Sequence, residues 1–369
     1  MKVLYVSTGY TTHDRRFLCS FAKSGWDVTF LSLLERVMDH RPLPDGVRLI
    51  TWLGDAGNPS DPSHWAGQGE AMKKVLGEER PDVVIAGTVH SGACVAAHAG
   101  ARPLVTVSWG SDILVDSFRD AATLEATRFT LNRSDAVFGD CQAVRDVVRD
   151  HAAISDERII TFPWGIDLER FSPDGPAAPV IERLGWSDKE VFISTRTWEP
   201  LYAIDVLVKA FAAVSAQRPA ARLMLLADGS LSGAIHQLID DLGLRQLVHT
   251  PGRLPYEQLP DFFRAASFYV SSALSDGTSV SLLEAMACGL PVVVTGSYGN
   301  LEWVEQGVHG ALALPGDHAS LAEAMLTVAG DPVARTAMRE ANIAVAQTRA
   351  NWDKNFPRLR DMVESLAPQ

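Results

Sequence analysis

Short apolar runs alternate with helix-like segments along most of the chain, and this alternation constrains the fold more than any other feature. In the first half, the apolar runs occupy residues 2–7, 27–33, 82–86, 104–107, 136–138 and 159–162. A helix is predicted over residues 14–24, where Phe17, Leu18 and Phe21 share one face. Continuous apolar runs of this length are typical of parallel strands that are buried on both faces.

A second alternating series follows residues 170–179, a stretch rich in Pro, Gly and Ala that reads as a linker. Its predicted strands are residues 191–195, 222–227, 248–250, 268–270 and 291–295, with helices at 204–215 and 233–242. We therefore predict an α/β protein with two doubly wound, Rossmann-like domains facing an interdomain cleft. The predicted ranges are 1–172 and 173–345, and a C-terminal helix in 346–369 is expected to pack back toward the N-terminal domain.

Net charge and composition limit the kinds of molecule that the protein could bind and indicate the cellular compartment in which it would work. The net charge is −12 and both halves are acidic, which argues against nucleic acid as a partner and leaves only peripheral membrane contact open. The N-terminus reads as a strand rather than a signal peptide, and we see no membrane-spanning run. The four cysteines have no CxxC spacing. We expect a cytoplasmic protein with free thiols.

The most informative motif lies at residues 275–295, which read as an acidic loop, a helix, a Gly-Pro stop and a buried strand. Gly277, Thr278 and Ser279 are expected to open the helix, where free backbone N–H groups attract an anion such as a phosphate. Asp276 precedes them. Glu284 falls two turns further on, among apolar residues where a carboxylate needs a partner. This layout suits a sugar nucleotide.

The segment 275–295 and three others together resemble family 4 of the glycosyltransferases, the retaining enzymes with the two-domain GT-B fold. The other three segments are residues 163–173, 223–229 and 248–259. The resemblance spans nearly the whole chain and is most specific between Pro163 and Gly316. It implies a glycosyltransferase that moves a sugar from a nucleotide-diphospho-sugar to an acceptor hydroxyl on a glycan, glycolipid or small molecule, with no cofactor.

The same resemblance implies roles for individual residues of the C-terminal domain. Glu284 would bind the ribose hydroxyls of the donor, and Asp276 would lie against the donor sugar. The amides of residues 277–279 would hold the distal phosphate, and Arg253 would flank the base. Arg196 would hold the diphosphate and stabilise the charge that develops on the leaving group. The leaving phosphate itself would act as the base for the acceptor hydroxyl.

The chain departs from the family pattern at four places. Asp276 stands where the family usually has Glu, and no lysine follows Arg196 at the usual distance of about five residues. Trp109 stands where a histidine usually precedes a Gly-x-Asp turn, here ending in Asp112. The usual N-terminal glycine pair is replaced by residues 8–16, which contain a single glycine.

Several residues of the N-terminal half are candidates with two interpretations each. Asp112 is either catalytic or the cap of a helix that begins near residue 113. The adjacent residues His13, Asp14, Arg15 and Arg16 either bind the acceptor or form the solvated first turn of a helix. His90 follows a predicted strand, and it is either an acceptor contact or a hydrogen-bonded structural histidine.

Three tryptophans each follow a predicted strand at the expected ligand side. Aromatic faces stack on the C–H surfaces of sugars, so these residues are candidates for sugar contacts. We assign Trp109 and Trp198 to the donor and Trp164 to the acceptor. The alternative is that these side chains fill gaps between loops.

The sequence lacks the motifs that are typical of metal-dependent glycosyl transfer, of dinucleotide oxidoreductases and of P-loop NTPases. The sequence has no Asp-x-Asp for a metal clamp, so we expect a metal-independent enzyme. It also lacks the glycine-rich loops of dinucleotide oxidoreductases and P-loop NTPases. Two alternatives remain open: a sugar-nucleotide epimerase on the same fold, and a catalytically degenerate protein that binds nucleotide or sugar without turnover.

Overall fold

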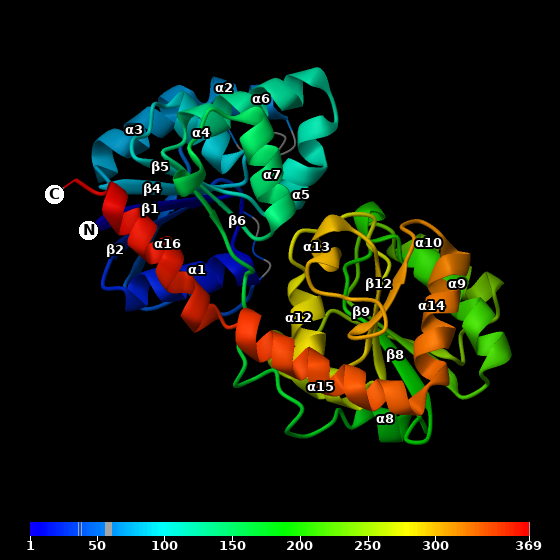
Figure 1. Ribbon diagram of the computed structural model, residues 1–369. Helices are drawn as coiled ribbons and strands as arrows, with labels where there is room; N and C mark the ends of the chain where they lie inside the picture. Colours follow the sequence, from blue (N-terminus) through cyan, green and yellow to red (C-terminus); the bar gives the residue numbers. More distant parts are fainter. Residues whose placement is uncertain (36, 38, 56–60, 369) are drawn as a thin grey trace. The chain divides into compact units, whose positions relative to one another are not determined.

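The computed structural model describes residues 1–35, 37, 39–55 and 61–368, which fold into two compact α/β units (Figure 1). The first unit comprises Met1–Pro163 and the residues from Asp353 onward, and the second comprises Trp164–Trp352. Residues 164–172, which we assigned to the N-terminal domain from the sequence, lie in the second unit.

The first unit is built on a seven-stranded parallel sheet in the order β3-β2-β1-β4-β5-β6-β7. Its strands are β1 (Lys2–Ser7), β2 (Asp27–Ser32), β3 (Val47–Thr51), β4 (Val83–Gly87), β5 (Leu104–Val107), β6 (Ala136–Gly139) and β7 (Ile159–Thr161). Its helices are α1 (Thr12–Lys23), α2 (Pro62–Gly67), α3 (Gly69–Glu79), α4 (Gly92–His98), α5 (Ser111–Leu114), η1 (Asp116–Phe118), α6 (Ala121–Arg133), α7 (Gln142–His151) and η2 (Asp156–Arg158).

The C-terminal helix α16 (Trp352–Leu366) packs on the first unit beside α1 (Figure 1). Its Phe356 ring lies 6.0 Å from that of Phe21, and Trp26 Nε1 donates a 3.2 Å hydrogen bond to Glu364. Leu359 and Val363 are fully buried. The helix therefore completes the hydrophobic layer on the α1 side of this sheet.

The second unit is built on a six-stranded parallel sheet in the order β10-β9-β8-β11-β12-β13. Its strands are β8 (Glu190–Ser194), β9 (Ala221–Leu226), β10 (Val248–Gly252), β11 (Phe268–Ser271), β12 (Val292–Thr295) and β13 (Gly310–Ala313). Its helices are α8 (Val180–Arg183), η3 (Pro200–Tyr202), α9 (Ile204–Gln217), α10 (Ser232–Asp241), η4 (Tyr256–Gln258), α11 (Leu259–Ala265), α12 (Val280–Ala287), α13 (Tyr298–Leu301), α14 (His318–Gly330) and α15 (Pro332–Arg349).

Each face of the second sheet has its own hydrophobic core, because successive strand residues point to opposite faces. Phe192 packs in the core under α9, α10 and α14, whereas Val191 and Ile193 pack in the core under α11, α12 and α15. Figure 1 shows α12 and α15 on one side of this sheet and α9, α10 and α14 on the other. This two-sided burial explains the continuous apolar runs in the sequence.

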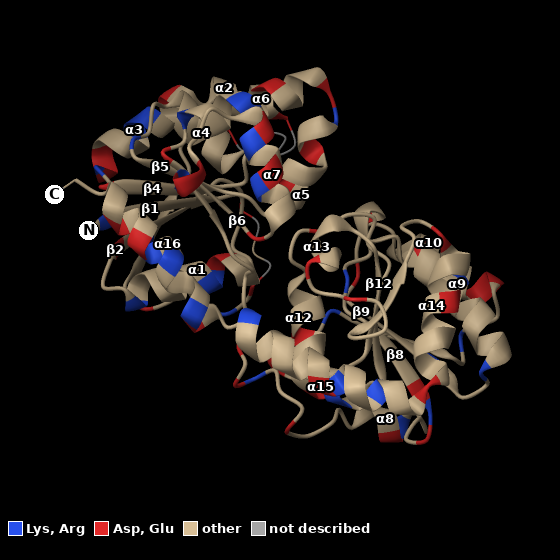
Figure 2. Cartoon of the chain, viewed as in Figure 1, with Lys and Arg blue, Asp and Glu red and all other residues tan. Residues whose placement is uncertain are grey.

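Charged residues of the described strands lie only at the first or second strand position, so the carboxyl ends of both sheets are free of charge within the strands (Figure 2). The strand order reverses between β1 and β4 in the first sheet and between β8 and β11 in the second. In open parallel sheets, ligands bind outside the carboxyl ends at such a reversal. A ligand of either unit is therefore expected at its strand reversal.

One described segment, Pro200–Gln217, is long and apolar enough by composition to pass as a membrane span. Its helical part is α9, whose residues Leu207 and Phe211 are fully buried in the core of the second unit. A core helix passes the same compositional test, so this is weak evidence for a span. The four cysteines carry no disulfide, and three of them are buried.

Candidate functional site

The strand reversal of the second sheet places two predicted site segments next to each other. Arg196 follows the carboxyl end of β8, and Asp276 lies in the loop that connects β11 to α12. β8 and β11 are neighbours in the sheet, so residues far apart in the sequence meet at this edge. We call the group Arg196, Asp276, Ser279 and Ser281 the arginine cluster.

Arg196 is the centre of the arginine cluster. Its Nη2 lies 2.8 Å from Asp276 Oδ2, and its Nη1 donates hydrogen bonds to Ser279 Oγ at 2.7 Å and Ser281 Oγ at 3.2 Å. The side chains of Arg196 and Asp276 are only 10% and 17% exposed. A buried guanidinium with one carboxylate partner is suited to an additional anionic ligand.

Two tyrosines complete the surroundings of Arg196. The Tyr202 ring lies under the guanidinium, with 4.1 Å between the guanidinium carbon and the ring centroid. The Tyr269 hydroxyl is 2.8 Å from Ser281 Oγ. Neither tyrosine nor Ser281 was predicted from the sequence, because nothing in their spacing shows that they meet Arg196.

Burial perturbs the titration of this ion pair. It raises the pKa of the Asp276 carboxyl above its usual range, against the opposing effect of the Arg196 charge and of hydrogen bonds from Ser279 and Gly277. For Arg196, burial is the largest single effect and acts to lower the pKa, but Asp276, Tyr202 and Tyr269 together raise it further, so the guanidinium stays charged. The site therefore keeps a fixed positive charge beside a carboxyl that protonates more readily than usual.

Unused hydrogen-bonding capacity gathers at the same edge of the sheet. Buried side-chain atoms without a hydrogen-bond partner in the described part of the chain include one atom each from several residues that follow β8, β11 and β12 or end these strands. They are Ser194 Oγ, Thr195 Oγ1, Arg196 Nε, Ser271 Oγ, Ser297 Oγ and Asn300 Oδ1. Buried polar atoms normally have partners, so this edge is suited to a polar ligand.

Helix α12 begins later than the sequence predicted. Ser279 is its N-cap, with Oγ accepting a 3.4 Å hydrogen bond from the amide of Leu282, so Gly277 and Thr278 precede the helix. Thr278 and Ser279 are buried. Glu284 lies in α12 and is 3% exposed. The expected amides therefore belong to a loop that leads into the helix.

The loop before α12 is packed tightly against α13. A Cβ atom added to Gly299 would lie 1.9 Å from the carbonyl oxygen of Gly277, so only glycine fits at position 299. This close approach fixes the backbone directly after Asp276. It also explains how the loop holds its shape although it lacks regular secondary structure.

Two other residues predicted to bind the donor, Arg253 and Trp198, form contacts with residues outside the arginine cluster. Arg253 follows β10 and forms a largely exposed ion pair with Asp228, at 2.9 Å. Trp198 is 2% exposed and belongs to the hydrophobic core, where its Nε1 donates to the carbonyl of Leu226 at 3.2 Å. The structure thus places Trp198 among packing residues.

In the first unit, Asp112 ties two loops together. Its Oδ1 accepts hydrogen bonds from Ser108 Oγ at 2.7 Å and the Trp109 amide at 3.0 Å, and its Oδ2 accepts from the Val89 amide at 3.0 Å. Burial raises the pKa of this carboxyl. Asp112 lies inside α5, whose N-cap is Gly110, so the expectation that it caps a helix beginning near residue 113 is wrong. Its oxygens instead accept hydrogen bonds from two backbone amides and from the Ser108 hydroxyl, which join the neighbouring loops.

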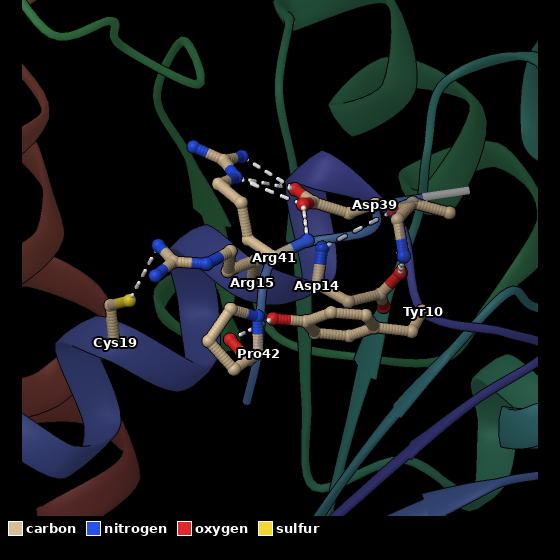
Figure 3. Close-up of polar contacts among 8 residues, drawn as sticks. Tyr10, Asp14, Arg15, Cys19, Asp39, Arg41 and Pro42 are labelled. Carbon is tan, nitrogen blue, oxygen red and sulfur yellow. Dashed lines mark hydrogen bonds and ion pairs between the residues drawn. The ribbon is translucent and has the colours of Figure 1, made fainter. Parts of the chain in front are cut away.

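At the start of α1, the four candidate acceptor residues divide by burial. Asp14 is fully buried and forms a capping box with Thr11, and it also accepts a 2.8 Å hydrogen bond from the Tyr5 hydroxyl. His13, Arg15 and Arg16 are half-buried. Figure 3 shows the Arg15 guanidinium beside Cys19, close to the ion pair of Asp39 and Arg41. Asp14 is thus engaged in holding the helix.

The remaining aromatic and histidine candidates are mostly interior. Trp109 is half-buried, and its ring lies 5.5 Å from that of His13, so these two candidates meet. Trp164 is 2% exposed and lies in the second unit. His90 is buried, and its Nε2 is 2.6 Å from Thr127 Oγ1. This contact agrees with the structural interpretation of His90.

His90 gives a testable pH dependence of stability. Burial lowers the pKa of His90 from 6.5 to about 4. Because the unfolded chain takes up the proton first as the pH falls from 6.5 to 4, this group destabilises the fold by about 3 kcal/mol over that range. We expect urea titrations to show a steeper acid loss for wild type than for His90→Gln, and the exposed-site variant His40→Gln should follow wild type. Parallel curves for wild type and His90→Gln would contradict the assignment.

No group of three or more His, Cys, Asp or Glu side chains within the described ranges is arranged to hold a metal ion. The positive charge of the arginine cluster comes from Arg196 itself.

Comparisons with known proteins match both units. A family model described as "Glycosyl transferase 4-like" matches residues 2–142, and one described as "Glycosyl transferases group 1" matches residues 180–345. Together these matches include most of both sheets.

Among curated proteins, the chain is similar to two mannosyltransferases. It is 25% identical over 316 residues to the GDP-mannose-dependent alpha-(1-6)-phosphatidylinositol monomannoside mannosyltransferase of Mycolicibacterium smegmatis, covering 79% of this chain and 78% of that protein. It is 29% identical over 213 residues to the corresponding enzyme for the monoacylated acceptor from Corynebacterium glutamicum, covering 55% of each. The latter match thus spans about half the length of that relative.

Among solved structures, the chain is similar to the sucrose-phosphate synthase of Thermosynechococcus elongatus, with a TM-score of 0.83, 19% identity and coverage of 99% of this chain and 98% of that one. The HepE protein of Anabaena, solved in complex with UDP-glucose, gives a TM-score of 0.79 at 20% identity, covering 99% of this chain and all of that one. At these identities the likeness establishes the architecture.

Proposed function

The chain belongs to the family 4 glycosyltransferases of the GT-B fold, and we propose that it transfers a sugar from a nucleotide-diphospho-sugar to an acceptor hydroxyl with retention of configuration. The observation that carries the proposal is the arginine cluster, with its buried guanidinium and the unused polar atoms around it. A nucleoside diphosphate supplies an anion for Arg196 and acceptors for the hydroxyl and N–H donors at this edge.

In this proposal, each residue of the second unit has a defined task. Arg196 binds the diphosphate and stabilises the charge that the leaving group gains, and the backbone amides of residues 277–279 contribute further hydrogen bonds. Asp276 accepts hydrogen bonds from the sugar, Glu284 from the ribose, and Arg253 flanks the base. The leaving phosphate takes the proton of the acceptor hydroxyl, so no protein nucleophile is needed.

We propose further that the reaction is metal-independent and moves a hexose. Arg196 supplies a permanent cation at the diphosphate, which is the task that a divalent metal performs elsewhere. GDP-mannose is the first donor to test, because the names of the two mannosyltransferase relatives specify it. A cytoplasmic location, where nucleotide sugars are supplied, is part of the same proposal.

A thermal-shift panel tests the donor site. We expect one of UDP, GDP, ADP and CMP, or one of their sugars, to stabilise wild type, by about 2.7 kcal/mol at 100 times its Kd. Glu284→Ala should abolish most of this shift, because the buried carboxylate is the proposed ribose ligand. The exposed variant Glu340→Ala on α15 is the matched control and should keep the full shift.

The outcome of the panel separates the functional classes. The absence of any shift with wild type would reject a nucleotide-sugar donor. A shift that survives in Glu284→Ala would move the binding site away from α12. Nucleotide binding without release of nucleoside diphosphate in the presence of acceptors would favour the degenerate binding protein over the transferase, whereas conversion of the donor sugar without acceptor would favour the epimerase.

A further inference from the structure

The Arg196 guanidinium lies over the Tyr202 ring. The distance from the guanidinium carbon to the ring centroid is 4.1 Å, well inside the range of a cation–π contact. The two terminal nitrogens of Arg196 make the contacts with Asp276, Ser279 and Ser281 described above. The arginine is thus held by the Tyr202 ring as well as through its two terminal nitrogens.

The backbone fixes the position of Tyr202. Its carbonyl oxygen accepts a 2.8 Å hydrogen bond from Ser272 Oγ, and the carbonyl oxygen of Leu201 accepts one of 2.8 Å from the Leu274 amide. These bonds join η3 to the loop that follows β11, and that loop continues to Asp276. Ala203, the next residue, has a left-handed backbone with φ of 44°, which turns the chain sharply into α9. Tyr202 therefore belongs to a rigid junction between the two halves of the arginine cluster.

An aromatic face differs from a carboxylate as a partner for a buried cation. It attracts the guanidinium through its quadrupole and restricts its orientation, but it does not neutralise the charge. A carboxylate in the same place would compete with an anionic ligand. A guanidinium with a covered face presents its N–H groups only along its edge, which is the direction suited to a bidentate phosphate contact.

We propose that Tyr202 is a positioning residue for the diphosphate site, holding Arg196 with its edge toward the place where the donor phosphates bind. This inference rests on the proposed function. It assigns to Tyr202 the orientation of the cation, so that the guanidinium exchanges contacts with Asp276 and the serines for contacts with phosphate without changing its plane.

The test compares ligands that differ by one phosphate. Kd values of GDP, GMP, UDP and UMP are measured by calorimetry for wild type, Tyr202→Phe and Tyr202→Leu. We expect Tyr202→Leu to weaken binding of the effective diphosphate about tenfold and its monophosphate by no more than about twofold, because the lost contact acts through the phosphate ligand Arg196. Tyr202→Phe keeps the ring and should restore the wild-type ratio of the two Kd values.

The matched control is Tyr256→Leu. Tyr256 lies in η4 of the same unit and also packs under an arginine, with Arg170 5.7 Å from its ring centroid. Its loss should leave the ratio of monophosphate to diphosphate Kd unchanged. A Tyr202→Leu variant with the wild-type ratio, or an equal weakening of both ligands, would overturn the positioning role. Failure of wild type to bind any of the four nucleotides would instead reject GDP- and UDP-sugars as donors, and with them the proposed function on which this role rests.

Discussion

Replacing Arg196 with methionine is expected to lower glycosyl transfer by at least about 100-fold while the protein stays folded. Removing one preorganised donor from a charge-stabilising site costs about 10²–10³ in rate, and Arg196 contributes both a charge and two contacting nitrogens. The measurement is the release of nucleoside diphosphate from the nucleotide sugar that stabilises wild type, with acceptor or, more slowly, with water as acceptor.

Two further variants separate chemistry from folding. Arg196→Met leaves the buried Asp276 carboxyl without its ion partner, so the double variant Arg196→Met/Asp276→Asn should recover stability without recovering turnover. Arg218→Met removes an arginine from a two-point pair with Glu190 in the same unit, and it should keep wild-type turnover. If Arg196→Met retained as much turnover as Arg218→Met, Arg196 would have no part in the reaction.

The architecture could be predicted because strands that are buried on both faces have continuous apolar sequences. The runs at residues 2–7 and 104–107 match β1 and β5, since every position after the first of β1 and all of β5 are buried. Two strands, β3 and β13, were not predicted from the sequence, for different reasons. β3 is an edge strand with exposed or half-exposed residues, and β13 reads Gly-Ala-Leu-Ala, which has little β propensity. Both segments become strands because they pair with a neighbouring strand, β2 for β3 and β12 for β13.

The site could be predicted only in part, because the position of a residue after a strand does not decide where its side chain points. Arg196, Asp276 and Ser279 were selected from the sequence, and the structure brings them together. Asp112 and His90 also follow strands, but their side chains are used by hydrogen bonds inside the first unit.

Tyr202 and Tyr269, by contrast, border the arginine cluster although nothing in the sequence marked them as candidates. Tyr202 meets Arg196 only because η3 is bonded to the loop after β11, and Tyr269 reaches Ser281 from the strand itself. No local pattern encodes these tertiary contacts. A sequence shows which residues border the edge of a sheet, whereas packing decides which of them serve the site.

Replacing Trp198 with a smaller residue is expected to cause a large loss of stability. Its buried indole packs in the core of the second unit and against His236 at 5.1 Å, and its backbone nitrogen and oxygen bond to the loop after β9. A Cβ at Gly229 would lie 2.5 Å from the Trp198 carbonyl oxygen, so that loop is fitted to the tryptophan. We expect Trp198→Ala to lower the free energy of unfolding by about 3–5 kcal/mol, as large-to-small substitutions of buried aromatic residues do.

Trp198→Phe distinguishes packing from ligand contact. It keeps most of the buried ring and loses the hydrogen bond to the Leu226 carbonyl, so we expect a loss of about 1–2 kcal/mol in urea unfolding. Its affinity for the nucleoside diphosphate should stay within about twofold of wild type if Trp198 only packs. A variant with unchanged stability and weakened nucleotide-sugar binding would return Trp198 to the donor site. Because the half-buried Trp109 lies beside His13 in the first unit, Trp109→Phe is the comparison in which a ligand effect without a large loss of stability is expected.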